Sequence, residues 1–217
     1  MPDAPLLLAI DQGTTNTKAL LLDTTGAIRA RAARPVSISF PQPGWVEQDP
    51  NELWTSAHQA AADCLAQCPG TPIAAIGLSN QRESILLWDR RTGRPAGPCI
   101  TWQCRRTTDS CEELRRQGLE STLRERSGLP LAPLFSASKL RWLLQHAGAP
   151  PDTLCAGTVD AWLLWNLTGG SSFATDLSNA ARTQLLNLDA CAWDPELLRI
   201  FSIPAACLPR VAPSSSL

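Results

Sequence analysis

The amino-terminal part of the chain alternates short apolar runs with turn residues. Apolar or alternating runs occupy Leu6–Ile10, Ala19–Leu22 and Ile28–Ala32, and Gly, Thr and Asp residues lie between them. Runs of this length, bounded by turn residues, are typical of β-strands. Because the three runs follow one another closely, they predict an antiparallel meander.

A helix is predicted after the meander. Asp49 is a favourable cap residue, Pro50 suits the first helical position, and Glu52 lies three residues past the cap. Apolar residues then recur on one face as far as a Pro-Gly pair, which predicts an amphipathic helix packed on the sheet. Ile73–Leu78 follows as a fourth strand, which the crossover helix should place parallel to an earlier one.

Shorter elements fill the rest of the chain. We expect extended segments at Ser84–Trp88, Cys99–Trp102 and Cys155–Val159, and helices at Arg105–Arg116, Ser136–His146 and Ala161–Leu167. Strands followed by alternating strands and helices indicate an α/β fold with a mixed sheet flanked by helices. The 217 residues, 44% of them hydrophobic, can form one core. We therefore expect a single domain over residues 1–217, with VAPSSSL at 211–217 as a linker.

Charge and composition exclude some partners. The net charge of −1, with both signs interspersed, offers no basic face for nucleic acid. The first residues lack a basic segment, and the apolar run behind them is too short for a signal peptide or a membrane span, so we expect a cytoplasmic protein. The eight cysteines include no CxxC unit and favour buried reduced thiols. Only Cys64 and Cys68 are spaced for a metal site, and zinc needs more ligands.

The sequence LLLAIDQGTTNTK, Leu6–Lys18, contains the first candidate site. A strand runs into Asp11, and Gly13, Thr14, Thr15 and Asn16 form a turn before the next strand. A glycine lets the backbone approach a bulky anion, and N–H groups and hydroxyls can surround phosphate oxygens. Lys18 adds positive charge, and Asp11 could hold Mg²⁺ or its waters. The alternative is a β-hairpin whose Gly and Thr residues only form the turn.

The sequence SNQRE, residues 79–83, contains the second candidate site. It directly follows the fourth strand, where ligands bind in open α/β sheets. Arg82 is a donor and Glu83 an acceptor, which together suit the hydroxyls of a polyol. Trp102 could pack against the C–H face of a carbohydrate. The alternatives are a solvated ion pair in a surface loop for Arg82 and Glu83, and ordinary packing for Trp102.

Six sequence blocks, in one order and spacing, carry a resemblance to a known family. They are DQGTTNTK, PGWVEQDP, IGLSNQRE, ITWQCRRT, GTVDAWLLWNLTGG and TDLSNAARTQL. Together they resemble the amino-terminal half of the FGGY carbohydrate kinases, and most closely the glycerol kinases among them. The resemblance covers essentially the whole chain and implies a ribonuclease-H-like domain of the actin and sugar-kinase superfamily.

The resemblance also implies an activity. A kinase of this kind transfers a phosphoryl group from ATP, with Mg²⁺, to a hydroxyl of glycerol or a related polyol or sugar. ATP and Mg²⁺ would bind at Asp11, Gly13, Thr14, Thr15, Asn16 and Lys18, and the acceptor at Arg82, Glu83, Trp102 and Leu134. Besides these small molecules, we include a homo-oligomer among the partners.

The catalytic Asp and most of the adenosine pocket of the family are expected in a second, carboxy-terminal domain. That domain lies outside these 217 residues, so we expect the chain alone to be an inactive half of a kinase. The alternative is a non-catalytic module that binds polyol and phosphate as a sensor or regulator.

Four further positions need separate interpretation. Leu134 stands where glycerol kinases carry a Tyr that hydrogen-bonds the substrate, and the chain contains no tyrosine. Glycerol is therefore in doubt, and a larger polyol or a ketose is an alternative. Asp160, in GTVDAW, is expected mainly as the cap of the following helix. Asn179 and Arg182 are candidates for shaping the pocket or a hinge.

Overall fold

The structure is a computed structural model that describes residues 4–215. Contacts divide these residues into two compact units. Unit 1 comprises residues 4–38 and 48–81, and unit 2 comprises residues 39–47 and 82–215. The expectation of a single domain over the whole chain stays a prediction. No helix within the described residues has the length and hydropathy needed to cross a bilayer.

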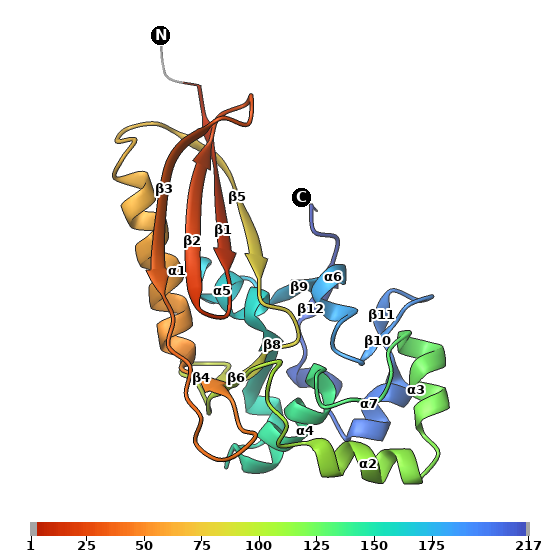
Figure 1. Cartoon of the computed structure of the whole chain (residues 1–217). Helices are drawn as coiled ribbons and strands as arrows, with labels where there is room; N and C mark the ends of the chain where they lie inside the picture. Colours follow the sequence, from red (N-terminus) through yellow and green to blue (C-terminus); the bar gives the residue numbers. More distant parts are fainter. Residues whose placement is uncertain (1–3, 216–217) are drawn as a thin grey trace. The chain divides into compact units, whose positions relative to one another are not determined.

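Unit 1 contains a mixed four-stranded sheet, in which β1 (Leu6–Gln12), β2 (Asn16–Leu22) and β3 (Ile28–Pro35) form an antiparallel meander. The fourth strand, β5 (Ile73–Asn80), pairs in parallel with β1, and the order is β3-β2-β1-β5 (Figure 1). Both the meander and the parallel fourth strand are as the apolar runs predict. The register places the end of β1 beside the start of β2.

Helix α1 (Pro50–Leu65) packs on one face of this sheet, against β2 and β3 (Figure 1). Asp49 caps it as predicted, because its carboxylate accepts a hydrogen bond from the backbone N–H of Asn51 at 2.8 Å. Glu52 does not complete a capping box. Its carboxylate accepts from the backbone N–H and hydroxyl of Ser37, at 2.9 and 2.8 Å, and so ties the helix to the chain after β3.

The two edge strands of this sheet differ in charge. At one edge β3 carries Arg29, Arg31 and Arg34. At the other edge β5 has the sequence IAAIGLSN, without a charged residue, and most of it is exposed. Ile76, in the middle of β5, is 51% exposed. The β5 edge is therefore apolar and uncharged.

Unit 2 contains most of a second sheet, of order β4-β7-β6-β8. Its strands are β4 (Glu47–Gln48), which ends at the boundary with unit 1, β6 (Ile85–Asp89), β7 (Cys99–Ile100) and β8 (Leu154–Thr158). Two small sheets pair β9 (Ala174–Asp176) with β12 (Arg210–Ala212), and β10 (Leu186–Asn187) with β11 (Ala192–Trp193). The ring of Trp88 on β6 is fully buried, and its centroid lies 5.2 Å from that of Trp162.

Helices surround these strands. They are α2 (Thr108–Arg116), α3 (Glu120–Ser127), α4 (Ser136–His146), α5 (Val159–Leu167), α6 (Leu177–Ala180) and α7 (Pro195–Phe201), with single 3₁₀ turns at Pro151–Thr153 and Ala205–Cys207. Helix α4 has the predicted bounds. Helix α2 begins three residues later than predicted, because residues 105–107 form a turn.

The expected linker at 211–217 needs a correction. Val211 and Ala212 belong to β12, where they pair with Thr175 and Asp176 of β9. The polar residues that follow suggested a linker, but the apolar pair before them extends a sheet. The last two residues of the expected linker, 216 and 217, lie outside the described residues.

Candidate functional site

The turn between β1 and β2 is closed by a short hydrogen bond. The backbone N–H of Gly13 donates to the carbonyl of Asn16 at 2.9 Å. A Cβ at position 13 would lie 3.0 Å from that carbonyl oxygen, so a larger residue would widen the turn. Thr15 and Asn16 are exposed, and Gly13 and Thr14 are half-buried. The predicted phosphate-binding residues therefore form one accessible turn.

The carbonyl oxygens of this turn are occupied by protein donors. The carbonyl of Thr14 accepts from the side-chain amide of Gln48 at 2.8 Å, and that of Thr15 accepts from the backbone N–H of Val36 at 2.9 Å. Carbonyl oxygens repel an anion, whereas hydroxyls and amide N–H groups bind it. Because the two carbonyls are engaged, the turn suits an anionic group.

Asp11 and Lys18 lie directly opposite each other on β1 and β2, and both are exposed. Within residues 4–215 neither side chain forms a hydrogen bond or an ion pair. A carboxylate and an ammonium in this state can interact with a ligand at no cost in existing contacts. The turn therefore has one free charge of each sign beside it.

Three buried glutamines, Gln12, Gln48 and Gln81, form hydrogen bonds with one another and with the backbone of the turn. Gln81 donates from its side-chain amide to the side-chain oxygens of Gln48 and Gln12, at 2.8 and 3.1 Å. The side-chain amide of Gln48 in turn donates to the carbonyl of Thr14, and that of Gln12 donates to the carbonyl of Gly13 at 2.6 Å. Their exposed fractions are 7% or less. A fully bonded buried amide network fixes the backbone it contacts, so the turn is preorganised.

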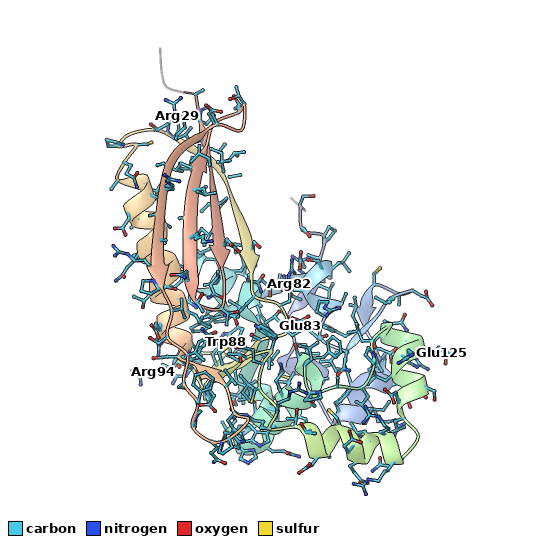
Figure 2. The ribbon with its side chains drawn as sticks, viewed as in Figure 1. Arg29, Arg82, Glu83, Trp88, Arg94 and Glu125 are labelled. Atoms are coloured by element: carbon cyan, nitrogen blue, oxygen red, sulfur yellow. The ribbon has the colours of Figure 1, made fainter. Side chains whose placement is uncertain are left out.

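Arg82 and Glu83 follow β5 and precede β6, and both are labelled in Figure 2. Glu83 has a φ of 63°, in the left-handed region that residues other than glycine rarely adopt. The hydroxyl of Ser136 donates to its carbonyl at 2.9 Å. The carboxylate accepts from Nε of Arg182 at 2.7 Å, and Nη1 of Arg82 donates to the hydroxyl of Ser178 at 2.9 Å. Strained backbone held by several contacts is typical of functional sites.

Trp102 and Leu134 are connected to this pair through two buried side chains. The hydroxyl of Ser84 accepts from the backbone N–H of Trp102 at 3.2 Å. Nζ of Lys139 donates to the carbonyls of Thr101 and Leu134, at 3.1 and 2.7 Å. Trp102 is 38% exposed. The structure thus brings the backbones at the four predicted acceptor residues into one network within unit 2.

Lys139 is fully buried although it is charged in solution. Burial lowers the pKa of its ammonium to about 7, and the thiols of Cys99, Cys104 and Cys111 and the Glu83 carboxylate only partly oppose this shift. Within residues 4–215 it has no ion-pair partner. Its two carbonyl contacts link the segment at Thr101 to the segment at Leu134.

The expectation that Asp160 caps the following helix is wrong. The cap residue of α5 is Thr158, and Asp160 lies inside the first turn. Its two carboxylate oxygens accept from the hydroxyls of Thr158 and Thr175, at 2.5 and 2.6 Å, and so tie α5 to β9. Burial raises its pKa. Asp176 is the cap residue of a different helix, α6, where its carboxylate accepts from the backbone N–H of Asn179.

Sequence reasoning missed the glutamine network and the partners of Glu83. The three glutamines stand within the blocks DQGT, VEQDP and SNQRE, so their positions were visible but their mutual contacts, 33 and 69 residues apart, were not. Arg182 was a candidate for shaping the pocket or a hinge, and not for contacting Glu83. The available signal for the glutamine network was that Gln12 and Gln81 directly adjoin the predicted site residues Asp11 and Arg82 in the sequence.

The residues near the turn fit Mg²⁺ better than a metal held by protein ligands alone. Within the described residues no three His, Cys, Asp or Glu side chains converge as a metal-binding group. Mg²⁺ keeps several waters and binds through one or two carboxylates together with substrate phosphates. The free carboxylate of Asp11 beside the turn at residues 13–16 meets that requirement.

Comparisons with known proteins identify the relatives of this chain. The profile of the FGGY family of carbohydrate kinases, N-terminal domain, matches residues 6–217. The chain is 50% identical over 208 residues to a glycerol kinase from Gloeobacter violaceus, covering 96% of this chain and 42% of that protein. It is 46% identical over 218 residues to an apulose kinase from Pectobacterium atrosepticum, covering 98% of this chain and 44% of that protein.

A solved structure agrees with the sequence relatives. The crystal structure of Plasmodium falciparum glycerol kinase with ADP matches with a TM-score of 0.91 and 30% identity, covering 97% of this chain and 44% of that one. The chain thus spans less than half the length of these relatives. The neighbours confirm the α/β fold of the actin and sugar-kinase superfamily. The chain belongs to the FGGY family of carbohydrate kinases, of which it matches the N-terminal domain, and it is similar to glycerol kinases.

Proposed function

We propose that the chain is the amino-terminal, acceptor-binding half of a cytoplasmic, ATP-dependent kinase that phosphorylates a hydroxyl of glycerol or a related polyol or sugar. The observation that carries this proposal is the fixed pair of Arg82 and Glu83, held by Ser178 and Arg182 in a chain of a kinase family. A donor and an acceptor fixed side by side suit an acceptor molecule with adjacent hydroxyls.

The residues of the turn would bind the terminal phosphates of ATP. Thr15 and Asn16 present a hydroxyl and an amide, and Lys18 supplies the positive charge that phosphoryl transfer requires. When bound, Mg²⁺ neutralises charge on the phosphates, and Asp11 would hold it or its waters. The carbonyl oxygens that would repel the phosphates are already engaged by Gln48 and Val36.

The residues of unit 2 would bind the acceptor. The carboxylate oxygen of Glu83 that has no donor within residues 4–215 would accept a hydrogen bond from one hydroxyl, and the remaining guanidinium N–H groups of Arg82 would donate to another. Trp102, partly exposed, would cover the C–H face of the molecule. Positioning of this kind accounts for much of the rate enhancement in two-substrate reactions.

Leu134 favours an acceptor other than glycerol. An aliphatic side chain at this position cannot hydrogen-bond a substrate hydroxyl, and leaving a buried hydroxyl unpaired costs roughly 1–3 kcal/mol. One relative of similar identity is named an apulose kinase. A ketose or a larger polyol therefore belongs in the substrate panel beside glycerol.

Kinase assays on the polypeptide that contains this chain in its source cell test the proposal. Wild type should phosphorylate at least one member of a polyol and ketose panel. Arg82→Ala and Glu83→Ala should each raise the acceptor KM at least about tenfold, because each removes a charged hydrogen-bond partner, and should leave the KM for ATP unchanged. An unchanged acceptor KM in both variants would remove the pair from the site.

The isolated chain of 217 residues should have negligible kinase activity. General-base catalysis contributes about 10² to 10⁴ in rate, and the resemblance assigns the base to the other half of the enzyme. An immunoblot of source-cell lysate with an antibody against the chain gives the mass of the native protein. A band near twice 23.4 kDa supports the proposal. A band at 23.4 kDa, or robust turnover by the isolated chain, would refute this half-enzyme account.

A further inference from the structure

Arg182 contacts the acceptor-binding carboxylate from the protein side. Its Nε donates to Oε1 of Glu83 at 2.7 Å, and its guanidinium lies 5.0 Å from the ring centre of Phe135. The Glu83 side chain is only 11% exposed, and that of Arg182 is 40% exposed. The ion pair is therefore partly shielded from water, and the aromatic ring limits the positions that the guanidinium can take.

The contact leaves one carboxylate oxygen of Glu83 for another partner. Within residues 4–215, Arg182 is the one donor to this carboxylate, and it engages Oε1 alone. A carboxylate with a single fixed oxygen can still accept hydrogen bonds at the second. Rotation about the last side-chain bond would exchange the two oxygens, and the bond to Nε opposes that rotation.

The backbone of Glu83 is held as firmly as its side chain. Its left-handed φ of 63° is stabilised by the hydrogen bond from the Ser136 hydroxyl to its carbonyl. Backbone and side chain are thus fixed from two different elements, α4 and the segment after α6. Restraint at both ends of a side chain is what a preorganised binding group requires.

The segment that contains Arg182 also contacts Arg82, the second residue proposed to bind the acceptor molecule. The hydroxyl of Ser178, in α6, accepts from Nη1 of Arg82 at 2.9 Å and itself donates to the carboxylate of Asp176 at 2.9 Å. Residues 176–182 therefore contact both Arg82 and Glu83 through side chains. The sequence TDLSNAAR at 175–182 forms a support for the pair that follows β5.

We propose that Arg182 is a positioning residue for acceptor binding, which holds Oε1 of Glu83 and thereby directs Oε2 at a hydroxyl of the acceptor. This inference rests on the proposed kinase function. It assigns to Arg182 an effect on acceptor affinity through Glu83, without contact between Arg182 and the reacting atoms.

Steady-state kinetics on the polypeptide that contains this chain in its source cell test the inference. Arg182→Gln should raise the acceptor KM roughly tenfold or more, the usual effect of losing a charged hydrogen bond, with little change in kcat and none in the KM for ATP. Arg199→Gln is the matched control, because Arg199 also pairs through Nε with a glutamate, Glu196, at 3.1 Å on the surface of unit 2. It should leave all three parameters unchanged.

A double-mutant cycle with Glu83→Gln separates positioning from a general structural effect. If Arg182 acts through Glu83, Arg182→Gln should add little to the KM defect of Glu83→Gln. Multiplicative defects in the double variant would overturn the inference, as would a wild-type acceptor KM in Arg182→Gln. If Arg182→Gln does not unfold cooperatively, Arg182→Met, which can still pack on Phe135, replaces it in the cycle.

The outcomes distinguish the two proposals. An active wild type with an unchanged acceptor KM in the Arg182 variants overturns this inference alone. A wild type that phosphorylates no polyol or sugar overturns the proposed function, and this inference with it.

Discussion

Replacing Lys139 by methionine removes a buried ammonium from unit 2. The side chain is fully buried, and its Nζ donates hydrogen bonds to the carbonyl oxygens of Thr101 and Leu134. Methionine has nearly the same length and no charge. The substitution therefore changes two quantities, namely the energy of burying a charge and the hydrogen bonds to two carbonyls.

The first quantity depends on pH. Burial lowers the pKa of Lys139 from its ordinary 10.5 to about 7. At about 1.4 kcal/mol per pH unit, the protonated side chain makes the folded state roughly 5 kcal/mol less stable in acid than a neutral one would. Between pH 7 and 10.5 the unfolded chain binds more protons than the folded chain, so the free energy of unfolding rises with pH.

The contribution of Lys139 to the free energy of unfolding is best measured between pH 7 and 9. Over this range the wild type should gain about 2 kcal/mol of stability from Lys139 alone. Near pH 9 an opposite effect begins, because burial raises the pKa of the Cys99 thiol from its ordinary 9.0 to about 12. The unfolded thiol then loses its proton while the folded thiol keeps it, which destabilises the folded state.

The second quantity, the loss of the hydrogen bonds to the two carbonyls, does not depend on pH. Methionine leaves the carbonyls of Thr101 and Leu134 without this donor, at a cost of about 1–3 kcal/mol each. The loss of the hydrogen bonds and the relief of the buried charge are similar in size near pH 7. We therefore expect Lys139→Met and wild type to have similar stabilities at pH 7, and wild type to be more stable by about 2 kcal/mol at pH 9.

Urea denaturation at pH 7, 8 and 9, followed by tryptophan fluorescence, measures this difference. Seven of the eight tryptophans lie in unit 2, so the signal reports mainly on the unit that contains Lys139. Lys18→Met, at the only other lysine, is the control, because that side chain is exposed and its removal should leave the wild-type pH dependence intact. Parallel pH profiles for wild type and Lys139→Met would refute the reasoning.

Three further substitutions test other parts of the structure. Gln81→Leu should lower the free energy of unfolding by about 2 kcal/mol in urea titrations followed by circular dichroism, because it removes the donor to the buried side-chain oxygen of Gln48; wild-type stability would show that the amide network contributes nothing. Under the proposed function, Leu134→Tyr should lower the glycerol KM of the polypeptide that contains this chain roughly tenfold by supplying a hydroxyl, and an unchanged value would exclude position 134 from the acceptor site. Gly157→Ala should cost about 1–3 kcal/mol, because its Cβ would lie 2.8 Å from the Cβ of Ala161 and 3.0 Å from the ring of Trp88; an unchanged melting temperature would contradict this.

The sequence predicted elements whose signals are local. The meander of unit 1 follows from apolar runs and turn residues, and the start of α1 from the Asp-Pro pair at 49 and 50. Helix α4 was predicted to begin near Ser136 and to end at His146, as it does, because apolar periodicity and the following Pro-Pro pair agree. In these segments neighbouring residues determine the structure.

The sequence did not predict elements that depend on distant partners. Helix α6 and strands β10 and β11 are only four, two and two residues long, which is too short for a periodic pattern. Strand β12 exists because it pairs with β9, more than 30 residues earlier. Asp160 was assigned to a helix cap because its partner Thr175, on another element, was unknown.

The same limit applies to the candidate site. The identity of Arg82, Glu83 and Trp102 came from the family blocks, but the residues that hold them did not. Lysine is usually exposed, so nothing in the sequence around Lys139 indicated a buried ammonium. The partnership of Glu83 with Arg182 joins residues 99 positions apart.

The uncharged edge of β5 has a practical consequence for work with this chain. An exposed, apolar edge strand presents unpaired backbone groups to other molecules and is a typical starting point for aggregation. The arginines of β3 protect the opposite edge of the same sheet by charge. Concentrated solutions of the chain should therefore self-associate through β5, around the exposed Ile76. A single lysine at Ala75, in the middle of that strand, should keep the protein monodisperse at concentrations where the wild type precipitates.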